Sequence, residues 1–327
     1  MRKLLLAVAI LILPAPAVGI DVRNEGATMT SDEPTADSLL GLADELFQAS
    51  DYEKALETYT QVTELARKEF NRPTETEALA QMARMQLILG HKDAGRVHLT
   101  EAESRADQSD PAGWSRFLGV KGRFQWKDDD LNAARKTFEQ MYEYCTSNAL
   151  WGRAIDAAHM IAIVAQTSED QIEWGRRGIE AAEKTDNERW LGPLWNNLAG
   201  TYYDMQQYDS SLACYEKARE YHWRFSGEIA KLFADYHVGM ANRKAGRLDE
   251  AGQWLRPVLA WAERLENHGV IGQALEDLGE IEIARGNKSK GLTMLRQARD
   301  EYKAAGYNES WTEVWDYINK RIDELNR

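Results

Sequence analysis

The acidic stretch that begins at Asp128 has residue types and spacing that could bind a metal ion. It reads Asp128-x-Asp130-x-Asn132 and is followed by Glu139. Carboxylate and amide oxygens at these intervals match the ligand pattern of a calcium-binding loop. However, Ala133 stands where the sharp turn of such a loop needs glycine.

The same segment also follows a helical pattern, through Ala134, Phe138 and Met141. Because one segment cannot be both loop and helix, we interpret its acidic residues as the start of a helix and predict no metal site. The six histidines show no ligand spacing, and the chain has no nucleophile elbow and no phosphate-binding glycine loop. The sequence therefore predicts a protein without a cofactor and without catalytic residues. An active site assembled only in three dimensions remains the alternative.

The elements that hold these residues follow a helical pattern that is clearest between residues 195 and 218. On the first helix, large and small residues recur at steps of three and four: Trp195, Leu198, Ala199 and Tyr202. After a tight turn at residues 206–208, the second helix continues the pattern with Ser211, Tyr215 and Ala218. The small residues Ala199 and Ser211 allow the two backbones to approach, and the aromatic rings fill the space beside them.

This order of large and small residues resembles the tetratricopeptide repeat, with its W-x2-L-G-x2-Y pattern and the small, aromatic, small sequence that follows. The small residue of the second helix recurs along the chain at Ala55, Gly95, Ala134, Gly175, Ser211, Ala251 and Gly291. The spacings are 40, 39, 41, 36, 40 and 40 residues, longer than the usual ~34 of the family. HEAT and armadillo arrays, with periods near 40, are the alternative.

Paired small residues favour the tetratricopeptide interpretation over that alternative. Twelve residues before each small residue of a second helix stand Ala43, Ala83, Gly122, Ile163, Ala199, Gly239 and Gly279. Only Ile163 is large, so the register of the fourth repeat stays open. The resemblance implies an all-α fold, a right-handed α-solenoid of about seven repeats over residues 37–305.

Turn and capping residues agree with this register. Gly90, Gly246 and Gly286 stand where a first helix must end. Ser50–Glu53 and Ser168–Gln171 have the spacing of capping boxes, which predicts helices that begin there. Asp110 followed by Pro111 similarly predicts a helix start.

The two cysteines, Cys145 and Cys214, fall on second helices two repeats apart. Helices that pack 8–10 Å from their neighbours would separate them by roughly 20 Å, beyond the ~7 Å limit on the Cα separation of a disulfide. We therefore predict that both are small buried packing residues.

The chain begins with a segment that we do not assign to the fold. Arg2 and Lys3 precede an apolar run over residues 4–13, then Pro14 and small-residue triplets, which is typical of a secretory signal peptide over residues 1–19. Ten apolar residues are too few to cross a bilayer, which needs about 20. The sequence thus predicts an exported protein, periplasmic or secreted, with no stable membrane span. The sequence does not decide between cleavage after Ala17, cleavage after Gly19 and retention of the segment as an anchor.

Two further segments flank the predicted array. Residues 20–36 are polar and predict a flexible leader. Residues 306–327 predict a capping helix that begins with a Ser310–Glu313 capping box. Its apolar stripe is Trp311, Val314, Trp315, Ile318, Ile322 and Leu325.

The resemblance also implies a function, that of an exported bacterial tetratricopeptide repeat protein. First helices of the family line a concave groove, which gives the partner-binding candidates Arg84, Arg123, Trp126, Asn196, Tyr203, Tyr236 and Arg243, with Lys127, Glu276 and Glu280 beside them. The lysine–asparagine clamp that some members use for a C-terminal carboxylate is absent at matching positions. We expect a non-catalytic scaffold that binds a peptide or protein segment with acidic and apolar groups.

The alternative function is a subunit of a periplasmic or cell-envelope assembly complex, whose interface would use the eleven tryptophans. The formal net charge of −13 disfavours nucleic acid and anionic membrane as partners. Neither the identity of the protein partner nor the oligomeric state follows from the sequence.

Overall fold

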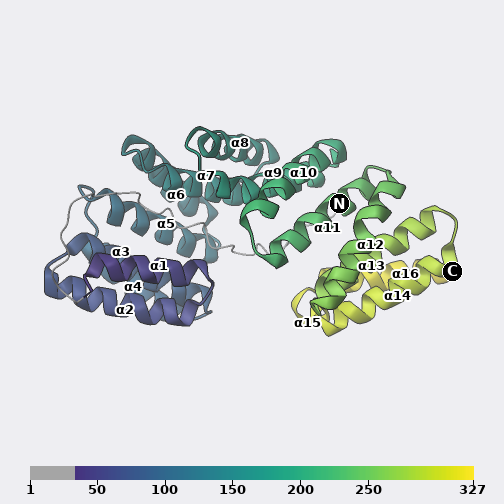
Figure 1. Cartoon of the computed structure of the whole chain (residues 1–327), viewed down its shortest axis with the longest axis horizontal. Helices are drawn as coiled ribbons and strands as arrows, with labels where there is room; N and C mark the ends of the chain where they lie inside the picture. The colour runs from purple at the N-terminus through teal and green to yellow at the C-terminus, as the bar shows by residue number, and fades with distance from the viewer. Residues whose placement is uncertain (1–33) are drawn as a thin grey trace. The chain divides into compact units, whose positions relative to one another are not determined.

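The structure, a computed structural model, describes residues 34–327, and the regular elements in this range are all helices (Figure 1). The predicted signal peptide and residues 20–33 of the predicted leader lie outside the described residues. The described chain divides into two compact units, an N-terminal unit that ends at Trp190 and a C-terminal unit over residues 191–327. Each unit is treated by itself below.

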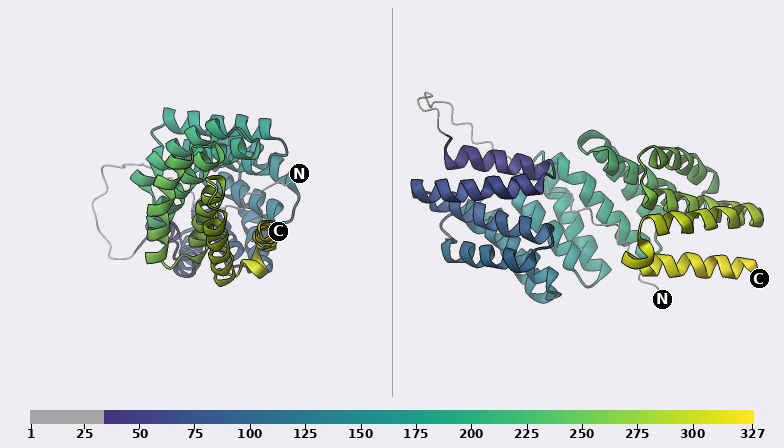
Figure 2. Two further views of the ribbon diagram at one scale, coloured as in Figure 1. Left: turned by 90° about the vertical axis from the view of Figure 1, so that its right-hand side faces the viewer. Right: turned by 90° about the horizontal axis from the view of Figure 1, so that it is seen from below.

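The N-terminal unit contains four pairs of antiparallel helices. They are α1 (Ala36–Gln48) with α2 (Tyr52–Glu69), α3 (Arg72–Ile88) with α4 (Lys92–Arg105), α5 (Pro111–Lys127) with α6 (Leu131–Ser147), and α7 (Trp151–Val164) with α8 (Ser168–Lys184), followed by the short 3-10 helix η1 (Glu188–Trp190). The first helices α1, α3, α5 and α7 pack on their own second helices and on one another. Figure 2 shows the pair α1 and α2 side by side, in purple.

The C-terminal unit contains three more pairs and two further helices. They are α9 (Leu191–Asp204) with α10 (Tyr208–Phe225), α11 (Glu228–Lys244) with α12 (Leu248–Arg264), α13 (His268–Ala284) with α14 (Lys288–Ala304), then α15 (Tyr307–Ser310) and α16 (Thr312–Asn326). The seven pairs confirm the seven predicted repeats. None of the helices in residues 34–327 is long and apolar enough to cross a membrane.

Small residues bring the two helices of a pair together, as the pattern predicts. A Cβ added to Gly291 would lie 2.6 Å from the carbonyl oxygen of Gly279, so side chains larger than hydrogen would push the helices apart. In the fifth repeat, the Ser211 hydroxyl fills the gap and donates a hydrogen bond to the Ala199 carbonyl at 2.9 Å. The close approach therefore depends on pairs of residues twelve positions apart.

The turns inside the repeats share a left-handed residue. Gly90, Gly246 and Gly286 have φ angles of 85°, 79° and 85°, which confirms the predicted helix ends. In the first repeat, Ser50 takes this left-handed position with a φ of 63°. The predicted capping box at Ser50 is therefore wrong. Asp51 precedes α2 instead, without a side-chain capping bond in the described structure.

The fourth repeat differs from the others in its turn. The small residue is the twelfth residue of α3, α5, α11 and α13, and the twelfth residue of α7 is Ala162. Ala162 is buried and Ile163 is half-buried, so the predicted small-residue position was one residue too late. Both Ala165 and Thr167 are extended in the turn that follows. Thr167 caps α8 by accepting a bond from the Asp170 amide, which corrects the cap predicted at Ser168.

The last helix covers the end of the C-terminal unit. Ile318 and Ile322 are buried against Leu295 and Tyr302, which confirms the predicted apolar stripe. The predicted capping box is wrong, because the Ser310 hydroxyl donates to the Gly306 carbonyl at 2.8 Å and ends α15. Helix α16 begins two residues later, at Thr312.

Both cysteines are buried on second helices, as predicted. Burial raises the pKa of the Cys145 thiol to about 12, so this side chain behaves as an apolar packing residue at neutral pH.

Candidate binding surfaces on the first helices

The acidic stretch at Asp128 is used for helix capping and ion pairs. Asp130 accepts a hydrogen bond from the Ala133 amide at 3.0 Å and caps α6. Asp128 pairs with Lys92 and with Arg96, whose Nη2 lies 2.5 Å from a carboxylate oxygen. Among residues 34–327, no group of three or more histidine, cysteine or acidic side chains is placed to hold a metal ion.

Charged side chains gather on the first helices of the N-terminal unit, where burial is costly unless the charges are paired. We call this group the arginine cluster; its members are Asp44, Glu77, Arg84, Arg116, Arg123, Arg153 and Asp156. They lie on α1, α3, α5 and α7. Asp44 and Arg116 are half-buried and the other five are buried. Because four guanidinium groups face three carboxylates, the cluster carries one excess positive charge.

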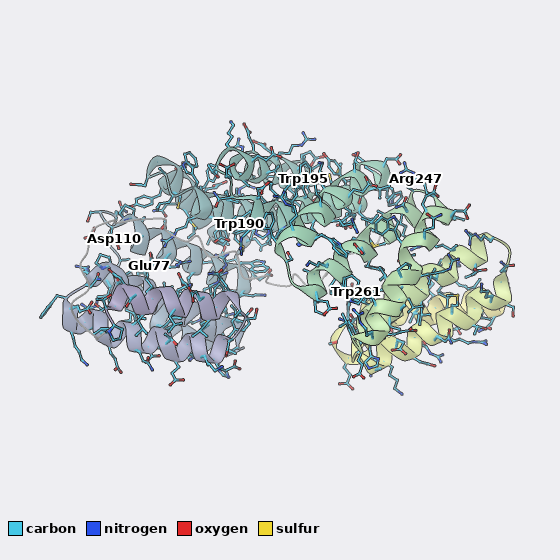
Figure 3. All side chains as sticks on the ribbon, viewed as in Figure 1. Glu77, Asp110, Trp190, Trp195, Arg247 and Trp261 are labelled. Atoms are coloured by element: carbon cyan, nitrogen blue, oxygen red, sulfur yellow. The ribbon has the colours of Figure 1, made fainter. Side chains whose placement is uncertain are left out.

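Glu77 is the central carboxylate of the arginine cluster, and Figure 3 labels it. Its Oε1 accepts a hydrogen bond at 2.6 Å from Arg153, which also donates to the Ser115 hydroxyl at 2.6 Å and to the carbonyl of Ala112. Burial would raise the pKa of Glu77, but Arg153 and Arg116 outweigh it and hold the pKa below its usual value. The Glu77–Arg153 bond joins α3 to α7 and so links the second repeat to the fourth.

A second ion pair joins the third and fourth repeats. Arg123 donates to the Asp156 carboxylate at 2.7 Å and to the Gly119 carbonyl at 3.0 Å. Burial would raise the pKa of Asp156, but the charges of Arg123 and Arg84 lower it. Arg123 was a predicted groove residue, and the structure places it inside this pair at 9% exposure.

Arg84 is the member of the cluster for which the described residues provide no salt-bridge partner, although its charge interacts with that of Asp156. It is 4% exposed, and its guanidinium lies 4.6 Å from the centre of the Phe47 ring. Its Nε has no hydrogen-bond partner among the described residues. Burial lowers the pKa of Arg84 to about 9, and the like charges of Arg123 and Arg116 add to the effect. The predicted groove residue Arg84 is thus a buried cation with unused donors.

The remaining predicted residue of this unit, Trp126, is half-buried near the end of α5. The ammonium group of Lys127 lies 4.3 Å from the centre of its ring, within the range of a cation–π contact. Its role in partner binding stays a prediction.

In the C-terminal unit, aromatic and charged side chains of α9, α11, α13 and α14 form a second group. We call it the tyrosine cluster; it consists of Tyr203, Tyr236, Arg243, Glu276, Asp277 and Tyr302. Three of its members are predicted groove residues: Tyr203 and Tyr236, each 7% exposed, and the half-buried Arg243. Arg243 forms an ion pair with Asp277.

Glu276 has the most perturbed carboxyl group of the tyrosine cluster. It accepts a hydrogen bond from the Tyr302 hydroxyl at 2.8 Å. Burial raises the pKa of Glu276 to about 7, and the neighbouring charge of Asp277 adds to the effect. Close to neutral pH this group therefore exists in both protonation states.

Asn196, the last predicted groove residue, is half-buried and forms a hydrogen bond with His237. Its Oδ1 lies 3.0 Å from Nδ1 of His237, whose ring stacks on Tyr215 with the ring centres 4.8 Å apart. Burial lowers the pKa of His237 to about 3, and that of His222 to about 4. Both side chains are consequently neutral in the folded chain at neutral pH.

Acidification should therefore destabilise the C-terminal unit. A histidine whose folded pKa lies below its unfolded value of about 6.5 contributes stability that is complete above pH 6.5 and is lost as the pH falls. We expect His237→Gln, which keeps an amide donor but cannot titrate, to reduce this loss by up to about 1.4 kcal/mol per pH unit. Urea unfolding of the full chain between pH 6.5 and 4.5 measures it. Equal slopes for the two proteins would contradict this account.

Several members of the arginine cluster were missed by the sequence analysis. It considered the residues one, four and five places after the small residue of a first helix, and three before it. Glu77 and Arg116 lie six residues before Ala83 and Gly122, and Asp156 lies six before Ala162. This position lies seven residues, nearly two helical turns, before the residue that follows the small one, so Glu77 shares a face with Arg84, and Arg116 with Arg123. The charged residues at this position could have indicated further members of the cluster.

Comparisons with known proteins agree with the geometry. The tetratricopeptide repeat family model matches residues 36–69 and 192–220, which cover the first repeat and part of the fifth. No curated protein matches the sequence significantly. The fold is similar to that of a signal transduction ATPase with numerous domains from Pyrococcus horikoshii, which has a tetratricopeptide repeat sensor. The TM-score is 0.70 with 13% identity, covering 88% of this chain and 44% of that one.

Two other solved structures match this chain over a larger share of their own length than the Pyrococcus protein does. The apo form of RapI has a TM-score of 0.67 and 14% identity, with coverage of 82% of this chain and 77% of that one. The apo form of the quorum sensor NprR from B. thuringiensis has a TM-score of 0.54 and 12% identity, with coverage of 89% and 87%. At this level of identity, the likeness shows the fold alone. This chain also spans less than half the length of the Pyrococcus protein.

Proposed function

Because the chain is a tetratricopeptide repeat protein, we propose that it is a non-catalytic scaffold that binds a peptide or protein segment on its first helices, outside the cytoplasm. The observation that carries this proposal is the placement of charged and aromatic side chains. The arginine cluster and the tyrosine cluster both lie mainly on first helices, which pack against one another in the N-terminal unit. The descriptions of two similar folds, as a sensor and a quorum sensor, are compatible with such a role.

The physical basis is a binding surface that exists before the partner arrives. Helices held by paired small residues need no ordering when a segment binds, so the loss of conformational entropy falls on the partner alone. A few aromatic or arginine side chains then supply most of the binding energy. Half-buried side chains such as Trp126 and Arg116 have area left to contact a partner.

The test is site-specific photo-crosslinking in the native host. A photoreactive amino acid at Trp126 or Asn196 places the probe on a first helix. The matched controls are Lys136 on α6 and Lys217 on α10, exposed positions on second helices. We expect a discrete crosslinked partner from the first-helix positions and none from the controls. Crosslinks from the second-helix positions alone would place the partner elsewhere and refute the proposal.

A separate experiment tests the proposed location outside the cytoplasm. The amino-terminal sequence of the mature protein, isolated from cell fractions of the native host, is expected to begin after Ala17 or Gly19. An intact Met1 in a cytoplasmic fraction would contradict export.

A second candidate function is a subunit of a cell-envelope assembly complex, favoured by aromatic side chains on second helices of the C-terminal unit. Trp223 on α10 is 43% exposed, and its ring centre lies 6.0 Å from that of Trp261 on α12. Figure 3 labels Trp261. Exposed tryptophans of this kind are common at the centres of protein interfaces. Purification from the native host separates the two functions, because a subunit would co-purify with one partner and would lose it in Trp223→Ala.

A further inference from the structure

One face of α1 carries an exposed row of leucines, which we call the leucine stripe. Leu39, Leu42 and Leu46 recur at steps of three and four residues, so they share one side of the helix. Leu42 is 48% exposed, and the other two are half-buried. Figure 2 shows α1 at the edge of the N-terminal unit, in purple. Apolar side chains grouped on a surface in this way are a feature of protein interaction sites.

The leucine stripe points away from the second repeat. Asp37 accepts a hydrogen bond from the Thr74 hydroxyl at 2.5 Å, and Asp44 accepts one from the Gln81 amide at 3.1 Å. These two carboxylates mark the side of α1 that meets α3. Successive residues of an α-helix are rotated by about 100°, which places Leu42 about 160° from Asp44. The leucine stripe therefore faces the position where a preceding repeat would pack.

In later repeats, the position of Leu42 is buried. Leu42 comes directly before the small residue Ala43. The equivalent residue of the second repeat is Met82, which is 7% exposed and lies against α2 of the preceding repeat, with 3.4 Å between the Thr63 hydroxyl and the Met82 sulfur. The third repeat has Lys121 at this position. The remaining four repeats have buried apolar residues there: Ile161, Leu198, Val238 and Leu278.

The last helix of the C-terminal unit shows how an array can end without such a surface. Helix α16 buries its apolar stripe, and its other side is exposed and polar, with Thr312, Glu313, Asp316, Lys320 and Asp323. A terminal layer needs a polar outer face to stay soluble. Residues 34–327 place no helix of this kind against the leucine stripe, so α1 has the composition of an inner layer at an outer position.

The surroundings of the leucine stripe are acidic. The first repeat, residues 36–69, contains eight carboxylate and three basic side chains, which gives a net charge of −5. Helix α1 itself has Asp37, Asp44 and Glu45 and no basic residue. Glu45 is exposed and lies three residues after Leu42, beside the stripe. A partner that covers the stripe should therefore be basic.

Two other occupants are disfavoured by this charge. A second copy of the chain, docked through its own α1, would bring two acidic surfaces together. Residues 20–33 contain four carboxylates and one arginine, so they would meet the same repulsion.

We propose that the leucine stripe binds a basic amphipathic helix of a protein partner, which packs on α1 as an additional outer layer. Such a helix presents apolar residues at steps of three and four, as the stripe does, and its lysine or arginine side chains face Glu45 and the neighbouring carboxylates. This surface is separate from the positions Trp126 and Asn196, so the crosslinking experiment described above does not decide it.

The first experiment measures protection of a thiol in the full protein from the native host, with a water-soluble maleimide as the reagent. Leu42→Cys places the thiol in the stripe, and Thr100→Cys places the control on an exposed position of α4. The native thiols Cys145 and Cys214 are buried. The probe is a synthetic amphipathic helix of leucine and lysine. At a concentration of about ten times its Kd, we expect it to slow the modification of Leu42→Cys about tenfold and that of Thr100→Cys not at all.

The second experiment measures the affinity of the same peptide by fluorescence anisotropy. We expect Leu42→Lys to weaken binding at least about tenfold, because it removes apolar contact area and adds a repelling charge. Val97→Lys is the matched control, since Val97 is a 65% exposed apolar residue on α4, outside the stripe. It should change the affinity less than about twofold, and both variants should keep the Tm of the wild type.

Four outcomes would overturn the inference. Equal protection of Thr100→Cys would show general attraction of the peptide to an acidic protein. Equal binding of a peptide with glutamate in place of lysine would remove the role of charge. Without peptide, a thiol of Leu42→Cys that is protected only at high protein concentration would identify a second copy as the occupant. Protection at all concentrations would identify the residues before α1.

Discussion

Replacement of Glu77 by glutamine is expected to lower the free energy of unfolding of the N-terminal unit by about 3–5 kcal/mol. The variant keeps the size of the side chain but leaves Arg153, which is 7% exposed, without its carboxylate. A buried cation without its counter-ion costs far more than the pair itself contributes. Hydrogen exchange of the slowest amides of α3, α5 and α7 measures the effect, because these amides report unfolding of the whole unit.

The matched control for this prediction is Glu180→Gln on α8. Glu180 pairs with Lys184 at 2.7 Å, but both side chains are mostly exposed, at 65% and 71%. Exposed pairs of this kind contribute little to stability, because water and salt screen their charges. If Glu77→Gln were as mild as the control, the ion pair between the second and fourth repeats would be unimportant for stability.

Tyr302→Ala is expected to lower the stability of the C-terminal unit by about 3–5 kcal/mol. Tyr302 is 1% exposed and packs among α13, α14 and α16 with Leu295 and Ile318. The fit is tight, because a Cβ added to Gly272 would lie 2.6 Å from the Tyr302 ring. Removing the ring leaves a cavity that rigid neighbouring helices fill only in part. Exchange of the slowest amides of α13 and α14 is the measurement.

Tyr302→Phe separates the packing of the ring from its hydroxyl group. It removes only the hydrogen bond to Glu276, with an expected loss of about 0.5–1.5 kcal/mol. This hydrogen bond lowers the pKa of Glu276, so the pKa should rise further in the variant. Similar losses for the alanine and phenylalanine variants would show that the hydroxyl, and not the ring, stabilises this end of the unit.

The helical repeat could be predicted from sequence because its causes are local. The pairing of Gly279 with Gly291, the glycine turns such as Gly90 and the apolar stripe with Ile318 all follow from helical spacing. The errors also have local causes. Ser50 has the spacing of a cap, but the turn needed a left-handed residue there. At the fourth repeat, an extended turn moved the register by one residue, from Ile163 to Ala162.

The charged groups of the first helices could be predicted only in part. Arg84 and Arg123 were identified as candidates, but their surroundings differ. Arg123 pairs with Asp156, whereas Arg84 lies over the Phe47 ring, and these contacts depend on how one repeat packs on the next. A residue 33 positions away supplies the counter-ion of Arg123. Helical spacing within one repeat contains no information about that residue.

The bond between Glu77 and Arg153 has a mechanical consequence. When a stack held by nearest-neighbour contacts is pulled from one end, its layers detach one after another, each at a small force. Here the ion pair of Glu77 and Arg153 connects the second repeat directly to the fourth, on either side of the third. Under tension, the second, third and fourth repeats should therefore resist the force together. We expect them to unfold in one step.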